Sequence, residues 1–176
     1  MKLNKAGYKC HLKIVGTGDC EEQMKSLVKS EKAEDFIEFT GPMSPENVRE
    51  EMKKASLFFI TSDKNEGWGA VLNEAMNSGC CCFANAAVGS APFLISDGVN
   101  GYIYSSENEL YKKAVSVIGD KPQMDKMGKN AYLTLVDNWN SEVAAKRLID
   151  LANALKIGKD TPFESGVCSK AIIIKG

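Results

Sequence analysis

The chain has 176 residues, of which 44% are apolar and 26% are charged, and its formal net charge is −1. This length fits one domain that buries a core without disulfide or metal staples. The nearly neutral charge argues against a nucleic-acid binder, which normally carries a strong basic excess. We therefore expect no nucleic-acid partner and interpret the four lysines within residues 2–13 as a solvated edge.

Targeting signals and cysteine usage favour a cytoplasmic protein. No apolar run approaches the ~20 residues of a membrane span, and residues 1–10 lack the apolar core of a secretory signal. The six cysteines include no C-x-x-C pair and there is one histidine, so we expect reduced thiols and no zinc site. Three consecutive cysteines, Cys80, Cys81 and Cys82, are typical of small buried residues in a strand.

Short apolar runs alternate with helical patterns along the chain. The expected strands, in chain order, cover residues 12–15, 36–40, 57–61, 80–84 and 101–104. Between them, one helix is expected after a cap at Asp19 and another from Ser44-Pro45, with proline at the first helical position. A third helix carries apolar residues from Val71 to Met76 and ends at Gly79.

Three more helices are expected after the last strand. Ser106 and Glu109 form a capping box for the first of them. Pro122 starts the second, which reaches about Asn138, and Ser141 caps the third. We expect residues 1–155 to form one domain and residues 156–176 to form a C-terminal tail.

The repeated order of strand and helix predicts an α/β fold with a Rossmann-like, doubly wound parallel sheet. In such sheets, ligands bind beyond the carboxyl ends of the strands. The candidate binding loops are therefore residues 16–20, 40–44, 61–69 and 84–92. A dinucleotide-dependent redox domain is disfavoured, because no G-x-G-x-x-G follows the first expected strand.

The loop before the third expected helix has the most informative chemistry. Gly67 and Gly69 flank Trp68, and glycine lets the backbone approach a ligand closely. The free amides at the helix start, from Gly69 through Ala70 to Val71, suit a diphosphate. A Gly-x-Gly at a helix start is equally compatible with a simple tight turn, so this pattern alone leaves both interpretations open.

Two carboxylates accompany these glycines. Glu66 precedes the helix, and Glu74 lies on it about two turns away from Glu66, so both can border one cleft. A carboxylate accepts hydrogen bonds from the vicinal hydroxyls of a ribose or hexose. The alternative is that Glu74 is an ordinary solvated residue of a helix.

The spacing of Glu66 and Glu74 resembles the E-x7-E signature of the group 1 (family 4) glycosyltransferases. The segments TSDKNEGWGAVLNEAMNSGC and GSAPFLISDGVNGYIY are similar to capsule or lipopolysaccharide members of that family. Upstream, HLKIVGTG and FIEFTGPMSPENV follow the family's order of segments. The resemblance covers roughly residues 8 to 155.

This resemblance implies the C-terminal, donor-binding half of a two-domain GT-B fold and retaining transfer from a nucleotide-sugar donor. In such enzymes the first glutamate of the motif contacts the transferred sugar, which makes Glu66 the candidate catalytic residue. The second contacts the ribose, the role implied for Glu74. The family needs no catalytic metal, and the sequence has no D-x-D motif, so we expect neither metal nor cofactor.

The other candidate donor-binding residues come from three loops. The Gly67–Val71 stretch would hold the diphosphate, and Thr40-Gly41 would lie near the nucleobase. Gly16 and Gly18 complete the set in the first loop. One departure concerns Phe93, which follows Pro92 where many members carry a glutamate, so a polar contact from this position is not expected.

The resemblance also implies parts that this sequence does not contain. The family's C-terminal half opens with a strand and a G-R…K-G segment, so we expect a domain whose first, central strand is missing. Unpaired buried backbone groups cost ~1–3 kcal/mol each. The apolar segment Ala171–Lys175, a partner chain, or direct pairing of the flanking strands would close the gap.

Acceptor binding is expected to need the absent domain, which would hold a glycan or lipid-linked acceptor, in the cytoplasm or at the inner membrane face. Two functions stay open from the sequence. One is the donor-binding part of a retaining glycosyltransferase, which alone is expected to show no turnover. The other is a non-catalytic nucleotide-binding or interaction module that kept the fold.

Overall fold

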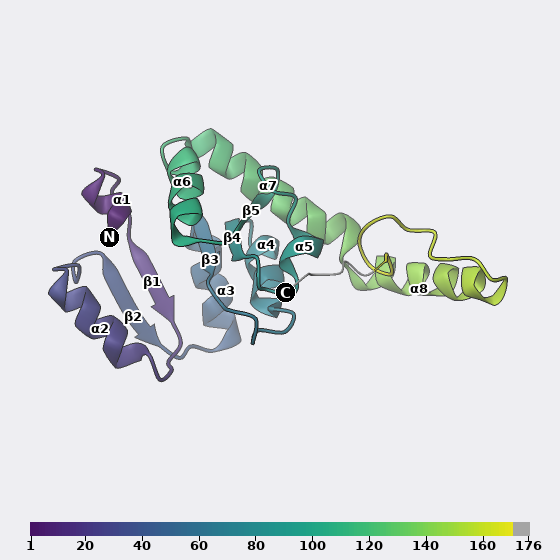
Figure 1. Cartoon of the computed structure of the whole chain (residues 1–176), viewed down its shortest axis with the longest axis horizontal. Coiled ribbons are helices and arrows are strands. Elements are labelled where there is room, and N and C mark those ends of the chain that lie inside the picture. Colours follow the sequence, from purple (N-terminus) through teal and green to yellow (C-terminus); the bar gives the residue numbers. More distant parts are fainter. Residues whose placement is uncertain (171–176) are drawn as a thin grey trace.

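A computed structural model describes residues 1–170 (Figure 1). Its strands are β1 (Leu12–Val15), β2 (Ile37–Gly41), β3 (Leu57–Ile60), β4 (Cys81–Asn85) and β5 (Gly101–Tyr104). Its helices are α1 (Lys2–Lys5), α2 (Glu21–Ser30), α3 (Pro45–Lys54), α4 (Ala70–Asn77), α5 (Ala91–Leu94), α6 (Glu107–Ile118), α7 (Lys121–Asn138) and α8 (Ser141–Lys156). The five expected strands are thus present in their expected places.

All strand pairs are parallel, but they form two sheets. β1 pairs with β2, with Leu12 opposite Ile37, and β3, β4 and β5 form the second sheet in that order. Within residues 1–170, β1 and β3 do not pair, so direct pairing of the two flanking strands is wrong. The alternative that Ala171–Lys175 fills the gap lies outside the described residues.

The core is built around β4. Its residues alternate between two faces, as a strand requires. Cys82 and Ala84 pack in one apolar cluster, chiefly with residues of α4 and α7. Cys81 and Phe83 pack in a second cluster with residues of α6, α7 and β5. The four residues are fully buried, which confirms the interpretation of Cys81 and Cys82 as small core residues of a strand; Cys80 is equally buried but precedes β4.

Two helix caps follow the expectation and two do not. Ser44 Oγ accepts a hydrogen bond from Asn47 N at 3.3 Å, and Ser106 Oγ accepts one from Glu109 N at 3.2 Å. The cap expected at Asp19 is wrong, because Cys20 already has helical backbone angles and occupies the N-cap position. The expected Ser141 cap is also wrong.

At the start of α8, Asn140 takes the capping role that was expected of its neighbour. Its Oδ1 accepts a hydrogen bond from Val143 N at 2.9 Å, which leaves Ser141 as the first helical residue. The helix therefore begins one residue earlier than expected.

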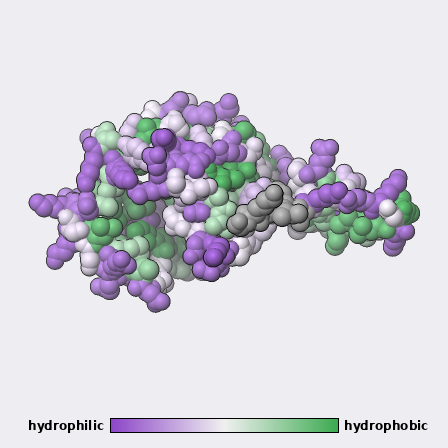
Figure 2. Space-filling model, viewed as in Figure 1, coloured by the Kyte–Doolittle hydropathy of each residue, from purple (hydrophilic) through white to green (hydrophobic). Residues whose placement is uncertain are grey.

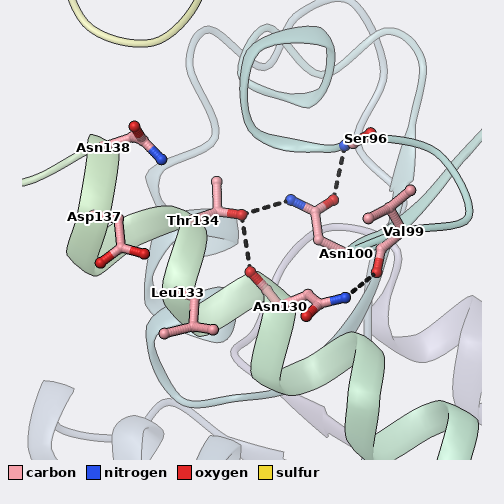
Figure 3. A pocket seen from close by; sticks show the side chains of 8 residues that line it. All are labelled: Ser96, Val99, Asn100, Asn130, Leu133, Thr134, Asp137 and Asn138. Atoms are coloured by element: carbon pink, nitrogen blue, oxygen red, sulfur yellow. Dashed lines mark hydrogen bonds between the residues drawn. The ribbon is translucent and has the colours of Figure 1, made fainter.

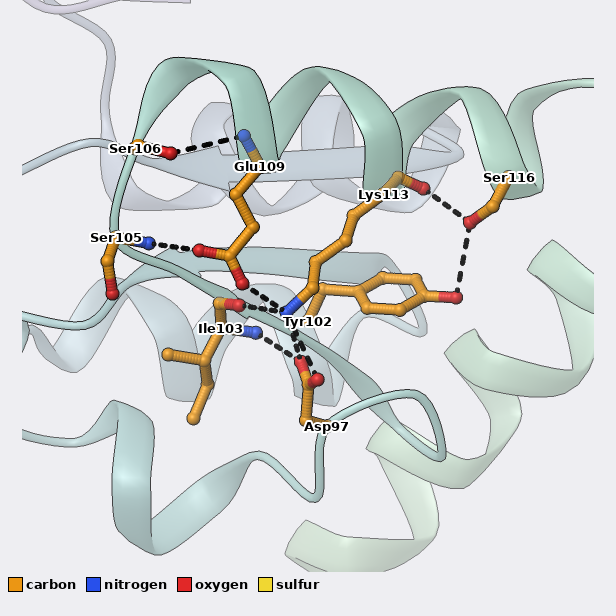
Figure 4. Close-up of polar contacts among 8 residues, drawn as sticks. All are labelled: Asp97, Tyr102, Ile103, Ser105, Ser106, Glu109, Lys113 and Ser116. Carbon is orange, nitrogen blue, oxygen red and sulfur yellow. Dashed lines mark hydrogen bonds and ion pairs between the residues drawn. The ribbon is translucent and has the colours of Figure 1, made fainter.

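A polar cluster holds β5 against α6 (Figure 4). Lys113 Nζ lies 2.9 Å from Glu109 Oε1 and 3.1 Å from Asp97 Oδ2. Asp97 Oδ1 also accepts a hydrogen bond from Ile103 N at 2.8 Å. Lys113 thus ties the turn before β5, the strand itself and the following helix together.

Helix α8 projects away from both sheets (Figure 1). It has no buried residue, and Leu148, Ile149 and Leu155 are 60%, 62% and 58% exposed. Figure 2 shows apolar residues along one side of this projecting part. None of the helices in residues 1–170 combines the length and the apolar character needed to cross a membrane.

Candidate functional site

The loops that follow β3 and β4 are joined through their backbones. Gly89 N donates to Gly67 O at 3.1 Å, and Ser90 N donates to Trp68 O at 3.0 Å. A Cβ atom at Gly89 would lie 2.3 Å from Gly67 O, which no side chain tolerates. Glycine at this position therefore lets two of the expected binding loops form one surface beyond the carboxyl ends of the strands.

Gly69 sets the start of α4. It is the N-cap residue and has left-handed backbone angles, φ 73° and ψ 55°. A Cβ here would lie 2.7 Å from Val88 Cγ1, so the position needs glycine for its conformation and for its space. With no side-chain cap, the N–H groups of Ala70 and Val71 have no acceptor within residues 1–170. They form a ready anion-binding position at the positive end of the helix dipole.

Glu66 lies directly against this helix start. Its carboxylate accepts a hydrogen bond from Ser62 Oγ at 3.3 Å, and its Cγ is 3.5 Å from the place a Gly69 Cβ would occupy. Glu66 is half-buried. The side chain is thus held over the first turn of α4, where it could contact a group bound at the helix start.

Glu74 is exposed on α4 and lines a cavity of about 310 Å³. The cavity lies where α4 approaches the end of α7, and its lining is mostly amide and apolar side chains: Asn73, Asn77, Leu135, Val136, Trp139 and Asn140. No hydrogen bond or ion pair engages the Glu74 carboxylate within residues 1–170. It is therefore available to hydroxyl groups of a ligand.

Trp68 is held by aromatic neighbours that the sequence did not reveal. Its ring centroid lies 5.7 Å from that of Phe93 and 5.6 Å from that of Trp139. Its Nε1 donates to Asn73 Oδ1 at 2.9 Å, and the side chain is still 41% exposed. The indole therefore links the glycine loop to α4, α5 and the end of α7, and it contacts Asn73 and Trp139, which line the cavity beside Glu74.

The candidates in the first two loops form a second group. Gly16 N donates to Gly41 O at 2.9 Å, and both glycines have positive φ, 113° and 69°. Thr40 Oγ1 donates to Ile14 O at 3.2 Å, and Gly18 is exposed nearby in the chain. Within residues 1–170, no hydrogen bond or ion pair joins this group to the Glu66–Glu74 group.

Comparison with known proteins now decides the family. The sequence profile described as "Glycosyl transferases group 1" matches residues 1–134, about three quarters of the chain. The chain belongs to the group 1 glycosyl transferases. This assignment confirms the predicted resemblance to that family.

Individual group 1 relatives are distant, and they are much longer. The chain is 26% identical to a poly(glycerol-phosphate) alpha-glucosyltransferase of Bacillus subtilis, over 86% of this chain and 24% of that protein. The chain spans a quarter or less of the curated relatives it matches.

Two crystal structures show the same fold. The C-terminal domain of LpcC, a glycosyl transferase group 1 family protein of Francisella tularensis, matches with a TM-score of 0.64 and 25% identity, over 70% of this chain and 64% of that one. Anabaena HepE in complex with UDP matches with a TM-score of 0.69 and 22% identity, over 86% of this chain and 44% of that one. The GT-B type of fold is therefore established for this chain.

The group 1 domain has one buried polar atom that no expectation included. Ser90 is fully buried, and its Oγ has no hydrogen-bond partner within residues 1–170. The residue follows Gly89 in the loop that bonds to Gly67 and Trp68. Sequence spacing could not identify this buried hydroxyl, because its burial results from the contact between the two loops.

A second cavity, of about 330 Å³, lies away from these loops (Figure 3). It is bounded by the turn before β5 and by α7. Asn100 fixes this turn: its side chain accepts from Ser96 N at 2.7 Å and donates to Leu94 O and Thr134 Oγ1, both at 2.9 Å. Since these hydrogen bonds satisfy the Asn100 side chain within the protein, we interpret this cavity as a feature of the fold and not as a ligand site.

Proposed function

We propose that this chain is the donor-binding part of a retaining group 1 glycosyltransferase. The complete enzyme would move a sugar from a nucleotide-sugar to a glycan or lipid-linked acceptor. The LpcC domain that shares this fold is the C-terminal part of a longer protein, which supports the assignment to one half of an enzyme. The acceptor would be bound by polypeptide outside these 176 residues.

One observation carries the proposal: the left-handed Gly69 leaves the first amides of α4 uncapped beside Glu66. In sugar transfer the bond between the anomeric carbon and the diphosphate breaks, and negative charge develops on the leaving diphosphate. Fixed N–H donors and the helix dipole stabilise such charge without rearrangement. The amides of Ala70 and Val71 would therefore hold the diphosphate.

The two glutamates would bind the two sugar rings of the donor. Glu66, held over the helix start, would accept hydrogen bonds from the transferred sugar, and Glu74, one turn further along, would accept them from the ribose. Anabaena HepE has been crystallised with UDP and with UDP-glucose, so a uridine donor is the first to test.

We propose that this binding needs no metal ion. Amides and the helix dipole would replace the cation that other sugar transferases use against the diphosphate. Within residues 1–170, no three His, Cys, Asp or Glu side chains converge on one point. Titrations with and without EDTA should therefore give the same affinity.

The test is calorimetric titration of the chain with UDP, GDP and UDP-glucose. Glu74→Ala should weaken UDP and UDP-glucose alike, by about ten- to hundred-fold, because a charge-assisted hydrogen-bond pair to the ribose is lost. Glu66→Ala should weaken UDP-glucose and leave UDP unchanged, because UDP lacks the sugar. Glu50→Ala is the matched control, since that carboxylate lies on α3 and pairs with its neighbour Lys53.

The outcomes separate the two functions that the sequence left open. Binding with this pattern, without turnover, supports the donor-binding half of a transferase. A folded chain that binds none of the three nucleotides at millimolar concentration contradicts the proposal and favours a non-catalytic module. Equal losses for UDP and UDP-glucose in Glu66→Ala would overturn the role given to that residue.

A further inference from the structure

Glu66 and Glu74 stand on two sides of a flexible junction. Glu66 belongs to the loop after β3, and Glu74 belongs to α4, which begins at Ala70. Between them lie Gly67 and the left-handed Gly69, and glycine leaves the backbone more freedom than any other residue. A bend at this junction changes the distance between the two carboxylates, so a ligand that needs both requires a junction that is fixed.

Helix α4 begins without the usual means of fixing its start. The N-cap residue is Gly69, and in the described part of the chain no side chain caps the first turn. Many helices have a second device, in which the residue before the N-cap (N′) packs against the fourth helical residue (N4) and fixes the angle at which the chain enters the helix. In α4 these two positions are Trp68 and Asn73.

A hydrogen bond joins the side chains of Trp68 and Asn73. The indole Nε1 donates to Asn73 Oδ1 at 2.9 Å, the usual length for such a bond. It is thus a polar counterpart of the apolar contact between N′ and N4. It also spans the junction, because Trp68 lies two residues after Glu66 and Asn73 lies directly before Glu74. We call this hydrogen bond the Trp68–Asn73 clasp.

The indole of Trp68 is held from other directions as well. Its ring lies at 34° to the ring of Phe93 and at 44° to that of Trp139, which are tilted arrangements that aromatic pairs favour. Its backbone O accepts a hydrogen bond from Ser90 N at 3.0 Å. Trp68 therefore cannot move relative to α4 without losing contacts to other segments, which makes it a firm anchor for the clasp.

Glu66 depends on the clasp more than Glu74 does. Glu74 is part of the helix, where its backbone O accepts a hydrogen bond from Ser78 N at 3.0 Å. Glu66 N donates to Asp63 O at 3.1 Å, and the Glu66 carboxylate accepts from Ser62 Oγ at 3.3 Å. Both of these partners of Glu66 belong to its own loop. They shape the loop but do not orient it relative to α4.

We propose that Trp68 and Asn73 are positioning residues of the donor site: the clasp holds Glu66 where one nucleotide-sugar engages both carboxylates. This inference rests on the proposed function, in which Glu66 contacts the transferred sugar and Glu74 contacts the ribose. UDP engages only Glu74, whereas UDP-glucose engages both residues. Loss of the clasp weakens UDP-glucose selectively, because Glu66 must then be ordered when the sugar binds.

Calorimetric titration of Asn73→Ala and Trp68→Phe with UDP and UDP-glucose tests this role. Both substitutions remove the clasp, and the phenylalanine keeps an aromatic ring beside Phe93 and Trp139. The affinity for UDP-glucose should fall about fivefold, as expected for the loss of one hydrogen bond, and that for UDP should change by less than about twofold. Asn153→Ala is the matched control and should alter neither affinity, since Asn153 is an exposed helical asparagine of α8.

Two further variants separate positioning from general damage to the fold. Asn73→Asp keeps an oxygen acceptor for the indole N–H and should restore the preference for UDP-glucose over UDP. Its added charge cannot imitate a loss of this preference, because UDP carries the larger negative charge and is repelled at least as strongly. When Asn73→Ala is added to Glu66→Ala, no further loss of UDP-glucose affinity should follow, because the clasp acts through Glu66.

Nuclear magnetic resonance of the nucleotide-free chain tests the clasp without any ligand. The chain has two tryptophans, so the indole N–H signal that is absent in Trp68→Phe belongs to Trp68. In Asn73→Ala the exchange of this proton with water should be at least about ten times faster. The backbone order parameter of Glu66 should fall from about 0.85 toward about 0.6.

Each outcome decides the proposal. Equal losses for the two nucleotides overturn it, as do unchanged affinities or a further loss in the double variant with Glu66→Ala. If the unmodified chain binds neither nucleotide, the proposed function fails; a fall in the order of Glu66 then still supports the clasp, and unchanged order overturns it. If Trp68→Phe fails to fold, Asn73→Ala decides alone, since alanine is the best helix former.

Discussion

At the scale of single residues, Gly69 combines two demands that a matched pair of variants separates. Gly69 and Gly98 both have positive φ, 73° and 77°, but a Cβ at Gly98 meets nothing within 4 Å. Gly98→Ala should therefore cost about 1 kcal/mol of unfolding free energy, the cost of the left-handed conformation alone. Gly69→Ala should cost about 2–4 kcal/mol, because the clash with Val88 is added.

Urea denaturation of the two variants measures this difference. Equal losses of unfolding free energy would mean that Val88 moves aside easily, and that Gly69 is required only for its backbone angles. The comparison also bears on the site, because only Gly69 controls the first amides of α4.

Single residues also show where the sequence is decisive. Ser44 is a reliable cap because Pro45 fixes the first helical position, and Ser106 because Glu109 follows at the spacing of a capping box. Asn140-Ser141 offers two good caps in succession, and local sequence does not choose between them. The choice depends on where α7 ends and how the chain turns, which is a tertiary property.

At the scale of elements, the buried cysteines at the start of β4 and directly before it should make the unfolding free energy fall at alkaline pH. Burial raises the pKa of the Cys80 thiol from 9.0 to about 11 and that of Cys81 to about 12, and it raises that of Cys82 as well. In the unfolded chain these thiols ionise near their ordinary pKa. As the pH rises above 9, the unfolded state therefore loses protons before the folded state does, and stability falls.

Each buried thiol should lower the unfolding free energy by up to about 1.4 kcal/mol per pH unit in the interval between its two pKa values. Urea denaturation at pH 8 and pH 10 measures the slope, and Cys81→Ala should make it shallower. The same slope in the variant and in the unmodified chain would show that Cys81 ionises in the folded state as easily as in the unfolded one.

The positions of the elements could be predicted from the sequence, whereas the contacts between distant elements could not. Strand positions and their order followed from short apolar runs, and the position of the glycine loop directly before α4 followed from local spacing. The contact of Trp68 with Phe93 and Trp139 did not, because it joins three segments that are distant in sequence. Ser90 has the same origin, since its surroundings come from the packing of two loops.

At the scale of the whole molecule, the two sheets differ in how firmly they are packed. Apart from Leu3, the residues of both apolar clusters lie between Val48 and Trp139, in the part of the chain that contains the β3–β4–β5 sheet. Neither includes a residue of β1, α2 or β2, and within residues 12–41 only Val28 and Ala33 are buried. This smaller unit is joined to the rest by Leu3 and by exposed ion pairs such as Lys13–Glu51, which contribute little.

The smaller unit should therefore unfold first, and the two tryptophans make this measurable. Trp68 and Trp139 are both in the larger unit, so their fluorescence reports on it alone, whereas far-UV circular dichroism reports on all helices and strands. The dichroism transition in urea should therefore begin at lower concentration than the fluorescence transition. Coincident transitions would indicate one cooperative unit. Stabilising contacts would then have to join the two sheets, which contradicts the separation of β1 and β2 from the two apolar clusters.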